Sequence, residues 1–470
     1  MLTKVYQGEC DLLALYRQNP ERYPFLLESV THAEHHALSR YSLLFAFPLQ
    51  RFSIPFPQLL SDQSFCQQFD EQMKLAQQTC EYDQPKTDLP FHGGWFVALN
   101  YELAAELEPS LQLLPHEFDL PSAVAVRMPA AIIIDHHQHQ THLVAEPQQA
   151  DAFVQMQSDI EPLFSDTLSV HPSNHHQTTS KNAEQADSIK QTKTAMLAAD
   201  LHSDRPQRYC EGVARIREYI AAGDVFQVNY SREWRGELLP HVHNADLYAR
   251  LRETNPAPFA ALCDFGDWSI ISSSPERLVC VNEGVIETRP IAGTRPRSAC
   301  VAQDQALLAE LIAHPKERAE HIMLIDLERN DLGRICETGS IEVNELMVLE
   351  SYEHVHHIVS NVRGRLREPV SVGEIIRAVF PGGTITGCPK VRCMEIIAEQ
   401  EQTGRGAYTG SVGYINHNGD LDLNILIRSI VRKDENISFR TGAGIVFDSQ
   451  AEHEREETEH KAKGLLNALR

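Results

Sequence analysis

The sequence has no excess of basic residues and no long apolar run. Of its 470 residues, 42 are Lys or Arg and 65 are Asp or Glu, which gives a formal net charge of −23. Because nucleic acids and anionic membranes are bound by clustered positive charge, the sequence indicates neither partner. No segment approaches the roughly 20 consecutive apolar residues that cross a bilayer. The first residues also lack a basic region followed by an apolar core, and ten scattered cysteines are typical of reduced thiols. We therefore expect a cytoplasmic protein.

Common nucleotide-binding and hydrolase motifs are also missing. The chain has no G-x-x-x-x-G-K-[ST] motif and no G-x-G-x-x-G motif between a strand and a helix, and residues 409–413 are not a nucleophile elbow. Four histidines that suggest a metal tract, His136, His137, His139 and His142, follow an apolar strand and lie among glutamines. A solvated turn is the better interpretation of this stretch.

Polarity divides the chain into three parts. Residues 1–164 mix short apolar strands with helices, residues 165–205 are polar and poor in large apolar side chains, and residues 206–470 carry the strongest helix and strand signals. The middle part predicts a linker or a surface insertion. The length alone allows one large α/β domain with insertions or two to three average domains.

Two segments place paired carboxylates on one face of a predicted helix. Glu317 and Glu320 form one i,i+3 pair, and Glu454 and Glu457 form another near the C-terminus. Lys461, seven residues after Glu454, returns to the same face. Carboxylates gathered in this way suit Mg²⁺, which prefers hard oxygen ligands. From spacing alone, two solvated acidic helices are the alternative.

A glycine-rich loop, Phe380-Pro-Gly-Gly-Thr-Ile-Thr-Gly-Cys-Pro-Lys, precedes a predicted helix over residues 389–401. Its hydroxyls and the backbone N–H groups at the helix start suit a carboxylate or phosphate, with an ordinary glycine turn as the alternative. A second glycine stretch, Thr441-Gly-Ala-Gly, comes just before the C-terminal acidic helix. Arg428, on a predicted apolar strand over residues 421–431, is a candidate for bidentate carboxylate binding, although an isolated Arg on a strand is more often at the surface.

Together these motifs resemble the chorismate-utilising enzymes, which include anthranilate, aminodeoxychorismate, isochorismate and salicylate synthases. The matching segments follow the family's order: Ser274-Pro-Glu-Arg-Leu, Thr288 to Arg297, His314 to Leu332, His354 to Ser360, Phe380 to Glu395, Tyr408 to Tyr414, Asp422 to Arg428 and Gly442 to Lys461. The resemblance implies an α/β (α+β) fold of large, mainly antiparallel sheets that face each other, with helices outside and the active site in the cleft between the sheets.

The resemblance also implies roles for individual residues. Mg²⁺ would be held by Glu320 and Glu457, with Glu317 and Glu454 nearby. Glu276 corresponds to the general acid that protonates the leaving ring hydroxyl, and His357 and Thr294 lie beside the ring. The implied substrate-binding residues are Gly293, Thr384, Tyr408, Arg428, Gly444 and Lys461.

The choice between family members depends on a few positions. Gln227 stands where isochorismate and salicylate synthases have a water-activating Lys, and an amide cannot act as that base, so ammonia is the expected nucleophile. Residues 381–387 and Pro258-Phe-Ala-Ala resemble aminodeoxychorismate synthase component I, which we favour. Against this, some aminodeoxychorismate synthases have a nucleophilic Lys where this chain has Ala292. Anthranilate synthase component I is the alternative, and a non-catalytic chorismate- or tryptophan-binding protein is an alternative of another class.

Two further expectations concern partners. The chain has no Gly-x-Cys-x-Gly elbow of a glutaminase, which implies a separate glutamine amidotransferase subunit as ammonia donor and chorismate as substrate. The segments around residues 25–30 and 39–43 resemble the tryptophan-binding element of anthranilate synthase. Its candidate residues are Leu27, Glu28, Ser29, Arg40, Tyr41 and Ser42.

Overall fold

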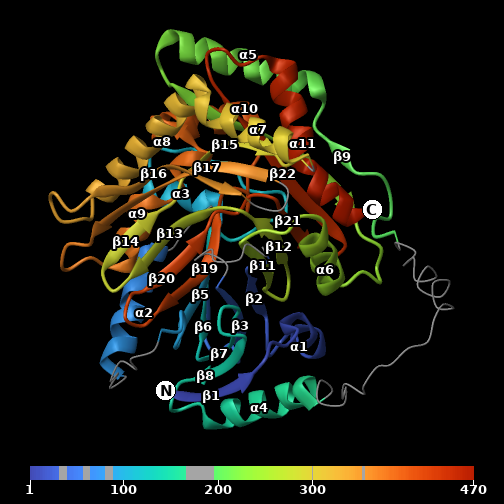
Figure 1. Ribbon diagram of the computed structural model, residues 1–470, viewed down its shortest axis with the longest axis vertical. Coiled ribbons are helices and arrows are strands. Elements are labelled where there is room, and N and C mark those ends of the chain that lie inside the picture. The colour runs from blue at the N-terminus through green and yellow to red at the C-terminus, as the bar shows by residue number, and fades with distance from the viewer. Residues whose placement is uncertain (31–39, 57–63, 80–87, 166–194, 299, 352–354) are drawn as a thin grey trace.

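The computed structural model describes residues 1–30, 40–56, 64–79, 88–165, 195–298, 300–351 and 355–470 (Figure 1). Of the polar stretch predicted as a linker, residues 166–194 lie outside this description, as does His354 of the matching segments. The helices are α1 (Leu12–Gln18), α2 (Phe65–Thr79), η2 (Tyr101–Leu103), α3 (Ala104–Leu107), α4 (Ala150–Ser165), α5 (Pro206–Ala222), α6 (Asn244–Thr254), α7 (Val301–Ala313), α8 (Pro315–Gly333), α9 (Val372–Val379), η4 (Gly383–Ile385), α10 (Lys390–Glu401) and α11 (Ala451–Leu469).

The strands of the described residues form two large antiparallel sheets. The twelve-stranded sheet has the order β1 (Leu2–Gln7), β8 (Gln140–Ala145), β7 (Ala130–Asp135), β3 (Tyr41–Ala46), β2 (Phe25–Glu28), β11 (Phe259–Asp264), β12 (Ser269–Ser274), β21 (Ser429–Lys433), β22 (Asn436–Ile445), β10 (Gln227–Glu237) and β18 (Gly387–Cys388), with β9 (His202–Ser203) on β10. The ten-stranded sheet has the order β15 (Ile291–Pro296), β17 (Val355–Arg365), β14 (Val285–Thr288), β13 (Arg277–Asn282), β20 (Leu421–Asn424), β19 (Ser411–Asn416), β5 (Gly94–Leu99), β6 (Ala123–Met128) and β4 (Arg51–Ile54), with β16 (Glu342–Ser351) on β17.

The inner faces of the two sheets pack against each other. Strand β3 shows how the sequence produces this, because its side chains alternate between faces. Leu43 and Phe45 enter the cluster between the sheets, whereas Leu44 enters the cluster under the outer helices. Across the interface, the rings of Phe25 on β2 and Phe96 on β5 stack with centroids 4.1 Å apart. A strand that is buried on both faces has a continuous apolar run in its sequence, which is the pattern of residues 43–46.

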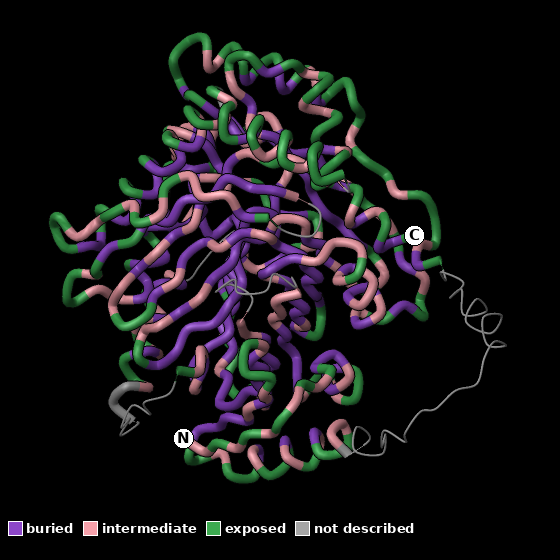
Figure 2. Tube along the Cα trace, in the orientation of Figure 1, coloured by how far each residue is buried: buried purple, intermediate pink, exposed green. Residues whose placement is uncertain are grey.

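Helices cover the outer faces of both sheets. One cluster joins the twelve-stranded sheet to α1, α4, α6 and α11, and another joins the ten-stranded sheet to α2, α8 and α9. Figure 2 shows the result as buried strands at the centre and exposed helices and turns at the periphery. The predicted fold, antiparallel sheets facing each other with helices outside, is therefore confirmed.

Segments far apart in the chain share both sheets. Strand β2 lies between β3 and β11, and β5 pairs with β19, so residues before 166 and after 194 form sheets together. At the β7–β8 turn, His136 and His139 each place Nδ1 2.9 Å from a carboxylate oxygen of Glu9, which agrees with the predicted turn. Within the described ranges, no helix has the length and apolarity needed to span a bilayer.

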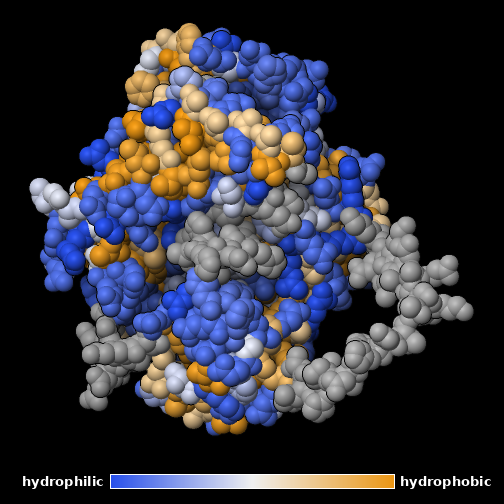
Figure 3. Space-filling model, in the orientation of Figure 1, coloured by the Kyte–Doolittle hydropathy of each residue, from blue (hydrophilic) through white to orange (hydrophobic). Residues whose placement is uncertain are grey.

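Apolar residues also reach the surface near the helix that carries Glu317 and Glu320. Figure 3 shows a hydrophobic band on one face of the molecule, over the region of α7 and α8. Exposed members of this region are Val301 and Ile312 on α7 and Ile322 on α8.

Candidate active site

Glu276 lies between β12 and β13, where the chain passes from the twelve-stranded sheet to the ten-stranded sheet. Its side chain is buried, and Thr384 Oγ1 donates a 2.7 Å hydrogen bond to its Oε1. Burial raises the pKa of Glu276 to about 7, although the Thr384 hydrogen bond and the charges of Lys461 and Arg428 act in the opposite direction. A carboxyl with this pKa is protonated in part of the molecules at neutral pH and can serve as a general acid.

The predicted glycine-rich loop brings Thr384 to this carboxyl. The loop follows α9, forms the short helix η4 and then pairs with β10 through β18. Gly387 has φ +130°, and a Cβ there would lie 2.1 Å from the carbonyl oxygen of Gln227, so only glycine permits this pairing. Two further bonds fix the loop, because Asn229 donates from N to Thr386 O (2.9 Å) and from Nδ2 to Thr384 O (3.3 Å).

His357 on β17 and Thr294 on β15 form a hydrogen-bonded pair opposite each other in the ten-stranded sheet. Thr294 Oγ1 lies 2.9 Å from His357 Nδ1. Gly293, with φ +71°, is the extra residue of a bulge that sets this register, and a Cβ there would lie 2.6 Å from Glu317 Oε2. Burial, reinforced by the charge of Arg428, lowers the pKa of His357 to about 4. The imidazole is therefore neutral at physiological pH.

Arg428 does not lie within a strand, and the prediction of one strand over residues 421–431 is wrong. Residues 421–424 form β20 in the ten-stranded sheet, and residues 429–433 form β21 in the twelve-stranded sheet. The chain crosses between sheets at residues 425–428, and Arg428 has φ +52°, a left-handed conformation that a continuous strand does not contain. The crossover brings the guanidinium near enough for its charge to lower the pKa of both Glu276 and His357.

Helices α8 and α11 carry the four predicted metal ligands, and both helices form as the sequence predicts. On α8, Glu317 pairs with Arg295 (3.0 Å), and Glu320 accepts a 3.1 Å hydrogen bond from Gln227 Nε2. On α11, Glu457 pairs with Lys461 (2.8 Å).

Both helices place a side chain close to the second glycine stretch. Lys461 donates a 2.9 Å hydrogen bond to Gly442 O, and a Cβ at Gly444 would lie 3.7 Å from Glu320 Oε1. In the part of the chain that the structure describes, no group of three or more acidic, His or Cys side chains is close enough to hold a metal as it stands. The donor chemistry nevertheless fits Mg²⁺, because all four side chains are carboxylates.

Tyr408 lies next to the same glycine stretch. Its hydroxyl lies 2.8 Å from the position of a Cβ at Gly442. Burial raises the pKa of Tyr408 to about 12, so the phenol remains a hydrogen-bond donor. The guanidinium of Arg405 lies 5.4 Å from the centre of its ring.

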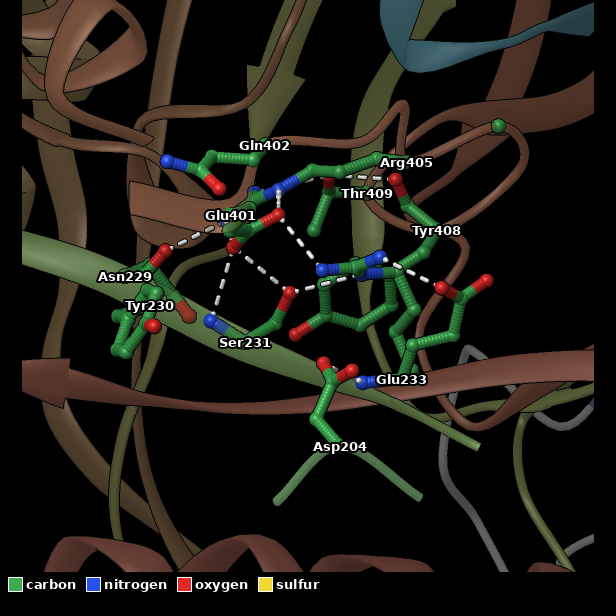
Figure 4. Close-up of polar contacts among 12 residues, drawn as sticks. Asp204, Asn229, Tyr230, Ser231, Glu233, Glu401, Gln402, Arg405, Tyr408 and Thr409 are labelled. Carbon is green, nitrogen blue, oxygen red and sulfur yellow. Dashed lines mark hydrogen bonds and ion pairs between the residues drawn. The ribbon is translucent and has the colours of Figure 1, made fainter. Parts of the chain in front are cut away.

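A buried ion network, which sequence reasoning missed, supports these elements (Figure 4). Arg405 Nη2 donates to Glu401 Oε1 (2.6 Å) and to Asn229 O (2.7 Å), and its Nη1 donates to Thr409 Oγ1 (3.2 Å). Arg440 on β22 donates to Glu401 Oε2 (3.0 Å). The i,i+4 spacing of Glu401 and Arg405 was the only sequence signal of this pair. The link to β10 and β22 depends on the tertiary fold.

The candidate tryptophan element lines a cavity of about 920 Å³. Leu27, Glu28, Arg40 and Tyr41 belong to its wall, together with Phe259 and Ala260 from the Pro258-Phe-Ala-Ala segment. The cavity wall does not include Ser29 and Ser42, among the residues described. Ser42 Oγ instead lies 2.8 Å from His136 Nε2.

Two charged side chains of this element already have partners within the protein. Glu28 accepts a 2.7 Å hydrogen bond from Tyr248, and Arg40 pairs with Asp135 (2.8 Å). Burial raises the pKa of Glu28. The structure thus brings together four of the six predicted residues at one cavity.

Comparison with known proteins agrees with this arrangement. A family described as chorismate binding enzyme matches residues 23–467. Aminodeoxychorismate synthase component 1 of Bacillus subtilis is 41% identical over 382 residues, covering 81% of this chain and 77% of the relative. An anthranilate synthase component I-like protein of Synechocystis is 38% identical over 450 residues, covering 94% and 86%.

Solved structures share the fold of this chain. Anthranilate synthase component I from Streptococcus pneumoniae superimposes with a TM-score of 0.73 at 29% identity, covering 92% of this chain and 94% of that one. The isochorismate synthase MenF from Escherichia coli shares the fold at 18% identity, with a TM-score of 0.68 and coverage of 100% and 95%. The chain therefore belongs to the chorismate-binding enzyme family and is an enzyme acting on chorismate, of the anthranilate and aminodeoxychorismate synthase type.

Proposed function

We propose that this enzyme replaces a ring hydroxyl of chorismate by an amino group to give 4-amino-4-deoxychorismate, the precursor of para-aminobenzoate in folate biosynthesis. The observation that carries the proposal is the buried carboxyl of Glu276, which accepts a hydrogen bond from Thr384 and has a pKa of about 7 under the influence of the Lys461 and Arg428 charges. Loss of a ring hydroxyl from a dianion requires a proton donor together with positive charge close to the ring.

Each group has a defined task in this reaction. Arg428 and Lys461 bind the two substrate carboxylates, and the phenol of Tyr408 donates a further hydrogen bond. Glu276 gives its proton to the departing hydroxyl, which leaves as water. The neutral His357, oriented by Thr294, lies beside the ring without adding a competing charge.

Mg²⁺ is the proposed cofactor, with Glu320 and Glu457 as its ligands and Glu317 and Glu454 close by. When bound, the ion would neutralise and hold a carboxylate of chorismate. Glu457, which is paired with Lys461, would bind the ion in place of that cation, and Lys461 would then be available for the substrate. The proposed site therefore requires this ion pair to open when the ion binds.

Ammonia is the proposed nucleophile, supplied by a glutamine amidotransferase subunit. Gln227 supports this assignment because its amide cannot act as a base on water, and it lies against Glu320 within the site. The cavity lined by Leu27 and Glu28 is the proposed binding place of tryptophan.

A second function, conversion of chorismate to anthranilate and pyruvate, is favoured by one observation. Ala292, buried on β15 and paired with Ile358, offers only a methyl group where a lysine would form a covalent bond to the ring. Amination at carbon 4 is favoured instead by residues 381–387, by the Pro258-Phe-Ala-Ala segment and by the Bacillus subtilis relative.

The test is to incubate the protein with chorismate, Mg²⁺ and ammonium at mildly alkaline pH and to identify the product by mass spectrometry. Aminodeoxychorismate, which retains the enolpyruvyl group, supports the proposal. Anthranilate with pyruvate supports the second function, and binding without turnover indicates a non-catalytic relative.

The variant Ala292→Lys tests whether position 292 lies at the substrate ring. We expect intact-mass spectra of this variant with chorismate to show an adduct of chorismate less one water, since an amine at this position can displace the ring hydroxyl. Absence of the adduct contradicts the placement of Ala292 at the ring.

A further inference from the structure

Two neighbouring amide side chains on β10 contact site residues through their nitrogens and leave their oxygens unpaired. Gln227 and Asn229 are two residues apart, so their side chains leave the same face of the strand. Gln227 Nε2 donates to Glu320 Oε1, and Asn229 Nδ2 donates to Thr384 O. Because a carboxylate and a carbonyl only accept hydrogen bonds, the amide nitrogens must face them. Gln227 Oε1 and Asn229 Oδ1 are then buried without a hydrogen-bond partner in the described structure.

Two glycines on the adjacent strand lie directly against these amides. Gly444 is the register partner of Asn229 on β22. A Cβ at Gly444 would lie 2.5 Å from Gln227 Nε2, and a Cβ at Gly442 would lie 3.0 Å from Asn229 Oδ1. Any larger residue at either position would therefore press on one of the amides.

Buried acceptors without partners favour a ligand that donates hydrogen bonds. Leaving such a group unpaired costs free energy, so a small molecule with several N–H groups gains by donating to it. Carboxylates of the substrate are repelled by the same oxygens. We propose that Asn229 Oδ1 and Gln227 Oε1 accept hydrogen bonds from the ammonia that attacks the ring, which makes Asn229 a nucleophile-binding residue.

This inference rests on the proposed function, and its geometry places the nucleophile next to the acid. Thr384 connects the two groups, since its hydroxyl donates to Glu276 and its carbonyl accepts from Asn229. The lone pair of ammonia forms the new C–N bond while the ring C–O bond breaks. The proton of Glu276 goes to the departing oxygen, which leaves as water. The new ammonium group then returns one proton to the Glu276 carboxylate, so chorismate and ammonia yield the amine and water.

The test is Asn229→Leu, which keeps the size of the side chain and removes the acceptor, assayed with ammonium as nucleophile. We expect the KM for ammonium to rise about five- to tenfold, as for one lost hydrogen bond, and to rise more than the KM for chorismate. Asn229→Asp loses the same Nδ2 donor to Thr384 O but retains an acceptor oxygen, so its KM for ammonium should stay well below that of Asn229→Leu.

Asn100, at the end of β5, is the matched control. Its Nδ2 also donates to a backbone carbonyl, Pro121 O, and its Oδ1 is also buried without a partner in the described residues. Asn100→Leu is expected to change the melting temperature and leave the KM for ammonium unaltered.

The possible failures are distinct. If the unmodified enzyme does not turn over chorismate with ammonium, the proposed function is wrong. If it does, and folded Asn229→Leu keeps the original KM for ammonium, the inference is overturned. A rise confined to the KM for chorismate also overturns it and assigns Asn229 to the ring hydroxyl.

Discussion

Thr384 Oγ1 donates a 2.7 Å hydrogen bond to Glu276 Oε1, so a loop residue more than a hundred positions later in the chain adjusts the acidity of the carboxyl. Because the bond stabilises the ionised form, it lowers the pKa that burial raises to about 7. Thr384→Val removes the donor and should raise this pKa.

Activity that requires protonated Glu276 falls as the pH increases through that pKa. We therefore expect the basic limb of kcat/KM against pH to move to higher pH in Thr384→Val. The measurement is a pH–rate profile from pH 6 to 9, with Thr384→Ser, which retains a hydroxyl, as the control. A limb that stays in place or moves to lower pH contradicts the assignment of Glu276 as the acid.

Glu276→Gln should stop the reaction and stabilise the fold in neutral and alkaline solution. The pKa of Glu276 is raised from 4.5 when unfolded to about 7 when folded, so the free energy of unfolding decreases as the pH rises between these values. Above pH 7 the loss amounts to about 3 kcal/mol, a rough figure from the pKa difference. The neutral amide in Glu276→Gln does not ionise, so the variant does not lose this free energy of unfolding.

The measurement is urea unfolding of both proteins at pH 5 and pH 8. We expect similar free energies of unfolding at pH 5 and a more stable variant at pH 8, together with a roughly 10²- to 10⁴-fold lower kcat. Equal stability at pH 8 would show that Glu276 is not ionised at a cost in the folded protein.

Glu320→Ala and Glu457→Ala test the proposed Mg²⁺ ligands. We expect each variant to keep its fold and lose turnover, and we expect Mg²⁺ to stop tightening chorismate binding, because the ion is no longer held beside the substrate carboxylate. Titration calorimetry with and without Mg²⁺ measures the second effect without catalysis. Glu456→Ala, an exposed neighbour on α11, is the control. Near-normal activity in either ligand variant means that the metal binds elsewhere.

Glu401→Gln should destabilise the protein more than any surface change of the same type. Glu401 accepts from both Arg405 and Arg440, and all three side chains are almost completely buried. Removing the negative charge takes from buried Arg405 its ion-pair partner and leaves Arg440 paired with Glu233 alone (3.5 Å), and breaking a buried pair in this way costs about 3–5 kcal/mol. Denaturant unfolding measures this cost. Glu218→Gln, which breaks an exposed pair with Arg215, should change stability by less than about 1 kcal/mol. Similar effects of the two substitutions would contradict the role assigned to the network.

The predictable part of the molecule is the part encoded locally. Helical spacing identified α8 and α11 together with Glu320, Glu457 and Lys461, and glycine chemistry identified the loop that carries Thr384. The family resemblance, and with it the prediction of two facing sheets, came from the order of the motifs along the chain.

What could not be predicted depends on segments that meet only in the folded protein. The bond from Gln227 to Glu320 joins residues 93 positions apart, and the bond from Arg440 to Glu401 joins β22 to α10. The crossover at Arg428 was mistaken for a strand because residues 421–431 have a suitable apolar composition, which does not reveal that the chain changes sheets. The position of Asn229 over two glycines likewise follows from the register of β10 and β22.

The interweaving of early and late strands also has a consequence for how the chain reaches its native state. Strand β2 pairs with β11, and β5 pairs with β19, and these partner strands follow more than 200 residues later in the chain. Contacts of such sequence separation form slowly. During synthesis, the early strands therefore keep unpaired, apolar edges until their later partners have been made. Such edges promote association with other chains. A nascent or truncated N-terminal segment should accordingly depend on chaperones, however stable the finished enzyme is.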